Sequence, residues 1–170
     1  DTVFENREDQ LRAWERIKRD EHRDGDGTPP GLFDSLPPSL PPLTKAYRIH
    51  SKAARAGFTW EQDEDVEQQV EAEWLEWLDA CAAGDERAQR HELGDLLFSM
   101  TELGRRKGIK ASEALDLANG RFLRRFARME AFAREQGKDF AALSLDEKDE
   151  LWNRAKEEEK VDGGDVPQEG

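Results

Sequence analysis

The chain has 170 residues, of which 36% are hydrophobic and 38% are charged, and its formal net charge is −13. This length suits one domain with its own core. The acidic balance argues against a nucleic acid polymer as partner, because binding a phosphate backbone needs clustered cations. The sequence contains no run of about 18 apolar residues, so no membrane contact is expected. One cysteine, Cys81, and a start without a signal-peptide pattern favour a cytoplasmic protein.

Apolar residues at helical spacing predict an all-α protein, taken here in chain order. A helix over residues 8–23 precedes a proline- and glycine-rich arm over 24–42, whose leucines favour packing against the domain. The next helix is expected over 43–56. Another begins at the acidic residues 61–67 and ends at a turn before residue 86. Three more are expected over 86–107, 109–134 and 146–156. We expect one domain over 1–160 and a flexible tail over 161–170.

Two pairs of carboxylates with i,i+3 spacing flank the turn before residue 86: Glu73 with Glu76, and Glu92 with Asp95. Residues three apart share a helical facet, so antiparallel packing of the two helices brings four carboxylates together. Hard divalent cations prefer such oxygen ligands. A solvated acidic face is the alternative, because 39 acidic residues also produce pairs by chance.

The position of these carboxylates favours the metal site. We expect the core stripes of the two helices to consist of Val70, Trp74, Trp77 and Cys81 on the first and Leu93, Leu96, Met100 and Leu103 on the second. The four carboxylates lie at the margins of these stripes, where unpaired negative charge is costly without a cation.

Cations and an aromatic residue near the C-terminus suit a phosphorylated ligand. Arg121 and Arg125 are one helical turn apart, and guanidinium groups match phosphate oxygens bidentately. Trp152 and Lys156 repeat this spacing, and a ring beside a cation suits a nucleobase with its phosphates. A solvated basic face and a core tryptophan are the open alternatives.

The order and spacing of several strings resemble the MazG family of nucleoside triphosphate pyrophosphohydrolases, over about residues 11–156. The strings are AWERIKRDE (13–21), SLPPSLPPLTKAYRIHSKAARAGFTW (35–60), VEAEWLEW (70–77), ELGDLLF (92–98), NGRFLRRFARME (119–130) and LWNRAKEEE (151–159). The chain is similar to the catalytic module at the C-terminal side of longer, two-module members.

The resemblance implies a MazG-like catalytic domain over 1–160: a four-helix-bundle core that forms a homodimer, with an N-terminal helix, a proline-rich arm and a C-terminal helix. It also implies hydrolysis of nucleoside triphosphates between the α- and β-phosphates, as house-cleaning of the nucleotide pool. Mg²⁺, with Mn²⁺ as a substitute, is then held by Glu73, Glu76, Glu92 and Asp95, the residues matching the family's EExxE and ExxD motifs.

Substrate contacts are also implied by the resemblance. Arg121 and Arg125 match basic residues that contact the triphosphate, and Trp152, with Lys156, matches the aromatic that stacks on the base. Lys18 matches a basic position in the family's WxxIK string.

Three positions depart from the family pattern: Ala72 replaces the first Glu of EExxE, and Gln69 and Ala88 replace basic residues. Glu102 stands where an Asn is usual, so either Glu71 or Glu102 is a candidate to compensate for Ala72. These departures motivate one alternative, a catalytically weakened nucleotide-binding regulatory module. The other alternative is a narrow dUTP or dCTP pyrophosphatase, which shares the all-α carboxylate scaffold.

Overall fold

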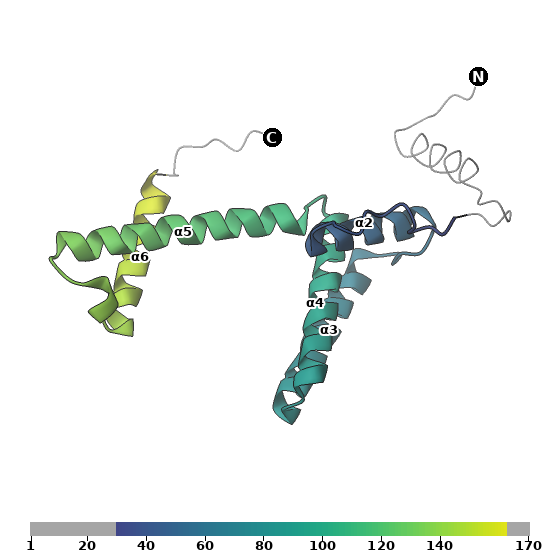
Figure 1. The fold of residues 1–170 in the computed structure, drawn as a ribbon, viewed down its shortest axis with the longest axis horizontal. Coiled ribbons are helices and arrows are strands. Elements are labelled where there is room, and N and C mark those ends of the chain that lie inside the picture. The colour runs from purple at the N-terminus through teal and green to yellow at the C-terminus, as the bar shows by residue number, and fades with distance from the viewer. Residues whose placement is uncertain (1–29, 163–170) are drawn as a thin grey trace, which may run out of the picture. The chain divides into compact units, whose positions relative to one another are not determined.

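The computed structural model describes residues 30–162 (Figure 1), and these contain five α-helices, one 3-10 helix and no strand. The elements are α2 (Pro42–Arg55), α3 (Asp63–Ala83), α4 (Glu86–Arg106), α5 (Ala111–Glu135), η1 (Phe140–Ala142) and α6 (Leu145–Asp162). The all-α prediction is confirmed, and the ends of α2 to α5 are close to those expected. The last helix was predicted too short, because α6 continues past 156 to Asp162. The helix expected over 8–23 and most of the tail lie outside the described residues.

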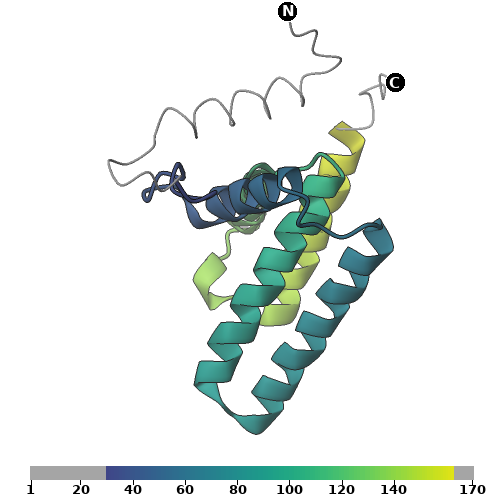
Figure 2. The same cartoon turned by 90° about the vertical axis from the view of Figure 1, so that its right-hand side faces the viewer.

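The described residues divide into two compact units, with the boundary between residues 112 and 113. In the first, α3 and α4 run side by side as an antiparallel hairpin, and α2 packs on α4 (Figure 2). In the second, α5, η1 and α6 share a core. The assembly of these helices into one bundle, and the single domain over 1–160, stay predictions.

The turn between α3 and α4 is fixed by Gly84, whose φ of +69° is readily adopted only without a side chain. Its N–H donates to the Cys81 carbonyl at 3.1 Å, and Asp85 N–H donates to the Ala80 carbonyl at 3.2 Å. The Asp85 carboxylate then caps α4 by accepting from the N–H groups of Arg87 and Ala88. This turn sets which residues of α3 and α4 face one another.

Polar side chains occupy much of the interior of the first unit. Glu102 is 1% exposed, and its carboxylate accepts from Arg105 Nε at 2.6 Å and from Arg105 Nη2 at 2.9 Å. Buried His50 donates through Nε2 to the Phe98 carbonyl at 3.0 Å and lies with Nδ1 3.5 Å from Glu102. These contacts join α2 to α4.

The expected core stripes of α3 and α4 are wrong for several large residues. Trp74, Leu93 and Met100 are 47%, 45% and 51% exposed. The buried apolar positions of the two helices are Val66, Ala80 and Leu96. Helical periodicity identifies an apolar face, but the hairpin buries only a narrow strip of it.

The core of the second unit is apolar and consists of Met129, Phe132, Ala133, Leu143, Leu151 and Ala155, with Phe140 and Trp152 packed against it. A capping box begins α6: Ser144 Oγ accepts from Glu147 N–H, and the Glu147 carboxylate accepts from Ser144 N–H. A hydrogen bond from Lys138, with the Ser144 N–H, lowers the pKa of Glu147 to about 2. None of the helices in residues 30–162 has the length and apolar character of a membrane span.

Candidate metal and nucleotide site

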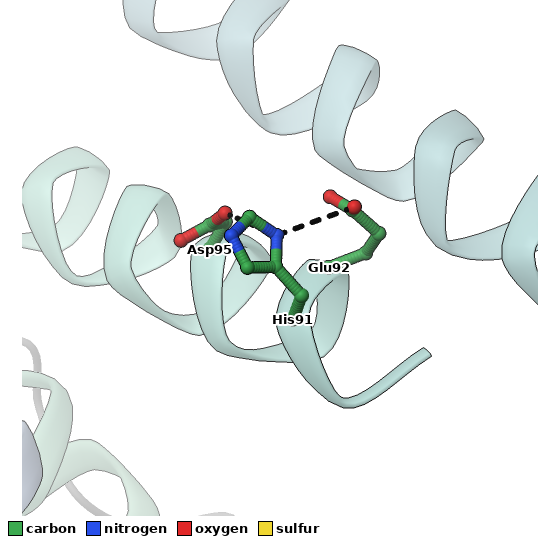
Figure 3. A group of neighbouring side chains, drawn as sticks. All are labelled: His91, Glu92 and Asp95. Atoms are coloured by element: carbon green, nitrogen blue, oxygen red, sulfur yellow. Dashed lines mark hydrogen bonds and ion pairs between the residues drawn. The ribbon is translucent and has the colours of Figure 1, made fainter. Parts of the chain in front are cut away.

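The α3–α4 hairpin brings the predicted carboxylates together. One ligand oxygen each from Glu73, Glu76 and Glu92 lies within 4.8 Å of the others. Asp95 forms a second group of the same size with Glu92 and His91 (Figure 3). Glu92, on α4, is common to both groups.

Electrostatics within this cluster favour a bound cation. The pKa of Glu76 is raised, first by the neighbouring charge of Glu73, then by desolvation, and further by Glu92 and Asp95. The uncharged Gln69 donates an amide hydrogen bond to Glu73 at 2.6 Å. The donors of the three-glutamate group are carboxylate oxygens, which suit Mg²⁺ and other hard divalent cations. The residues present therefore fit such an ion.

His91, a neighbour of the cluster, is not among the site residues predicted from the sequence. Its side chain is 71% exposed, but Nδ1 lies 3.1 Å from the Asp95 carboxylate and 3.3 Å from that of Glu92 (Figure 3). The i,i+4 spacing of His91 and Asp95 was the available signal.

Neither candidate to compensate for Ala72 joins the cluster. Among residues 30–162, the groups with metal-binding spacing include neither Glu71 nor Glu102. Glu71 is exposed. Glu102 lies two turns beyond Asp95, but its carboxylate forms an ion pair with Arg105.

Of the substrate residues predicted in the second unit, Arg125 lies beside Trp152. The Arg125 guanidinium lies 5.6 Å from the centre of the Trp152 ring, and Phe122 contacts the same ring at 5.3 Å between centroids. Arg121 is exposed, and Lys156 is half-buried one turn after Trp152. Trp152 also packs against the core, so the alternative that it is a core tryptophan holds for part of its ring. Lys18 lies outside the described residues.

An acidic partner of Arg125 was missed from the sequence. Arg125 Nε donates to the Glu159 carboxylate at 2.6 Å, and Arg124 Nη2 lies 3.4 Å from the other Glu159 oxygen. Residues 34 and 35 positions apart carry no local signal for such pairing.

Comparison with known proteins identifies relatives, although no protein-family model matches the chain. It is 33% identical over 161 residues to the nucleoside triphosphate pyrophosphohydrolase of Escherichia coli (strain K12), covering 94% of this chain and 60% of that protein. It is 33% identical over 145 residues to the nucleoside triphosphate pyrophosphohydrolase/pyrophosphatase MazG of Thermotoga maritima, covering 85% of this chain and 54% of that protein.

A third relative is the uncharacterized protein YabN of Bacillus subtilis (strain 168), at 37% identity over 94% of this chain and 32% of that protein. The predicted resemblance to the MazG family is thereby confirmed. The chain spans at most 60% of the length of these relatives, so the activity in their names describes longer proteins.

Proposed function

We propose, from this resemblance to the MazG family, that the chain hydrolyses nucleoside triphosphates to a nucleoside monophosphate and pyrophosphate. The observation that carries the proposal is the convergence of Glu73, Glu76 and Glu92 across the α3–α4 hairpin, with Asp95 beside them. The names of the longer relatives give the reaction class.

Four carboxylates, Glu73, Glu76, Glu92 and Asp95, would hold the ion. When bound, Mg²⁺, or Mn²⁺ in its place, neutralises phosphate charge, lowers the pKa of a coordinated water and stabilises charge developing on phosphorus. The carboxylates orient the attacking water toward the α-phosphorus by accepting its hydrogen bonds. Their negative charge would be balanced by the ion, so the carboxylates would not repel the triphosphate.

The substrate is held by residues of the second unit in this proposal. Arg121 and Arg125 bind the triphosphate, and Trp152 stacks on the base with Lys156 one turn away. The guanidinium of Arg125 over the Trp152 ring supports this assignment, because it places a phosphate-binding group beside a flat apolar surface. Lys18 is a further proposed contact.

A homodimer is part of the proposal. Several large apolar side chains are exposed on α3 and α4, and a second copy of the chain would cover them: Trp74, Leu75, Leu78, Leu93, Leu97 and Met100. Size-exclusion chromatography with light scattering tests this, and a monomeric mass at micromolar concentration would contradict it. The cytoplasmic location stays a prediction.

A catalytically weakened binding module is a second candidate, favoured by Gln69. This residue places an amide rather than a cation against Glu73, and Ala72 leaves the cluster one carboxylate short of the family pattern. A narrow dUTP or dCTP pyrophosphatase is the enzymatic alternative, in which the surroundings of Trp152 set base choice.

Pyrophosphate release from a panel of nucleoside triphosphates with Mg²⁺ tests the proposal. We expect release by the wild type and its loss in Glu73→Ala and in Asp95→Ala. Asp79→Asn, an exposed acidic residue of α3 outside the cluster, is the matched control. Unchanged release in both cluster variants would refute the site, whereas nucleotide binding without release by the wild type would favour the binding module.

A further inference from the structure

Glu159 holds the guanidinium of Arg125 from one side. Its Oε2 accepts from Arg125 Nε at 2.6 Å, while its Oε1 lies 3.4 Å from Arg124 Nη2. The Arg125 and Glu159 side chains are 24% and 31% exposed, so solvent reaches this ion pair only in part. The pKa of Glu159 is lowered, chiefly by its hydrogen bond from Arg125, which keeps the carboxylate charged.

The contact leaves the end of the guanidinium available. Within residues 30–162 the hydrogen bond of Arg125 to Glu159 uses Nε, and neither terminal nitrogen of Arg125 has a hydrogen-bond partner. The same group lies 5.6 Å from the centre of the Trp152 ring. Two terminal N–H groups on a planar fork are the donors that bind phosphate oxygens bidentately.

We propose that Glu159 is a positioning residue for triphosphate binding, which acts by holding Arg125 through Nε with both terminal nitrogens directed to the ligand. This inference rests on the proposed function, in which Arg125 binds the triphosphate. An arginine side chain loses considerable rotamer freedom when it binds, and a carboxylate that fixes it beforehand removes part of that cost.

Glu159 could also weaken phosphate binding, because its negative charge repels the phosphates and competes for Arg125. If Glu159 occupied the terminal nitrogens, a phosphate would have to displace it, and removing the carboxylate would tighten binding. The observed contact is at Nε instead, so phosphate and carboxylate are bound by different donors of one guanidinium. The geometry therefore favours positioning over competition.

The same pair of helices provides a matched control. Arg128 donates through Nε and Nη2 to Glu158 at 3.0 and 2.7 Å, and its guanidinium lies over Phe132 at 4.5 Å. This ion pair joins α5 to α6 as Glu159 does, but it lies outside the proposed site. Glu158→Gln therefore removes the same charge and a comparable interhelical contact.

The test is calorimetric binding of an α,β-methylene nucleoside triphosphate with Mg²⁺, alongside kcat and KM for the hydrolysed substrate. We expect Glu159→Gln to raise Kd and KM about threefold to tenfold, the range expected when one long side chain must be ordered by the ligand. We expect kcat to change by less than about twofold, because the interaction is made equally in the ground and transition states. Glu158→Gln should bind as the wild type does.

A double-mutant cycle separates positioning from a general structural role. If Glu159 acts through Arg125, Glu159→Gln has no further effect on Kd in an Arg125→Ala background. Binding by Glu159→Gln that equals or exceeds that of the wild type would overturn the inference, as would an equal loss in both backgrounds.

These outcomes are distinct from failure of the proposed function. Weakened analogue binding by Glu159→Gln in a protein that releases no pyrophosphate would support the positioning role and refute the hydrolase. Pyrophosphate release by the wild type, together with analogue binding by Glu159→Gln that equals that of the wild type, would support the hydrolase and refute the positioning role.

Discussion

Replacing Glu92 with Gln is the perturbation that most directly affects the candidate metal site. Glu92 is shared by the two groups of ligand atoms, and its side chain is only 18% exposed. Gln keeps the shape of the side chain but removes the charge. We therefore expect the variant to fold with a thermal midpoint equal to or above that of the wild type without metal, because repulsion within the cluster is reduced.

The expected loss appears when Mg²⁺ is added. An ion that binds only the folded state at 100 times its Kd stabilises that state by about 2.7 kcal/mol. If loss of a ligand weakens binding about tenfold, the stabilisation at the same concentration falls to about 1.4 kcal/mol. For a chain of this size the difference corresponds to a midpoint shift smaller by about 3–5 °C.

Thermal unfolding followed by circular dichroism at several Mg²⁺ concentrations measures this shift. Asp79→Asn, on the same hairpin and outside the cluster, should retain the full effect of Mg²⁺. Equal stabilisation of the wild type and Glu92→Gln by Mg²⁺ would refute the assignment, because the ion would then be bound elsewhere.

Three further predictions concern the interiors of the two units. Glu102→Leu should lower the free energy of unfolding by about 3 kcal/mol in urea titrations, because it leaves Arg105 without its buried carboxylate; an unchanged midpoint would contradict this. Burial lowers the pKa of His50 from 6.5, although the nearby Glu102 opposes this, so the unfolded chain takes up the proton more readily than the folded one. The stability linked to His50 is therefore present above pH 6.5 and is lost as the pH falls below it. We expect the urea midpoint of His50→Gln to change less between about pH 7.5 and pH 5.5 than that of the wild type. An equal decline of the midpoint in both proteins would contradict this. Phe132→Ala, at 0% exposure, should cost about 3–5 kcal/mol by the same titrations, and a loss below 1 kcal/mol would contradict the described core.

The carboxylate cluster could be predicted because it depends on local rules. The i,i+3 spacing places Glu73 with Glu76, and a short turn with Gly84 makes the next helix return alongside. Two helices joined in this way bring Glu92 opposite the first pair without further information. The helix ends followed from residues whose effects are equally local, such as Asp85 at the start of α4.

Features that depend on distant partners could not be predicted in the same way. Glu102 shares a facet with Asp95, but its partners include Arg105 and His50, and His50 comes from α2. Periodicity also predicted Trp74 as core, whereas burial depends on which neighbouring element covers that face. The pairing of Arg125 with Glu159 likewise requires the path of the chain between α5 and α6.

Product analysis by ³¹P nuclear magnetic resonance tests the central claim most directly. A single nucleoside triphosphate is incubated with the protein and Mg²⁺, in parallel with Glu73→Ala. We predict resonances of a nucleoside monophosphate and pyrophosphate in equal amounts from the wild type, and neither from the variant. A nucleoside diphosphate with inorganic phosphate, or the same products from Glu73→Ala, would contradict the account.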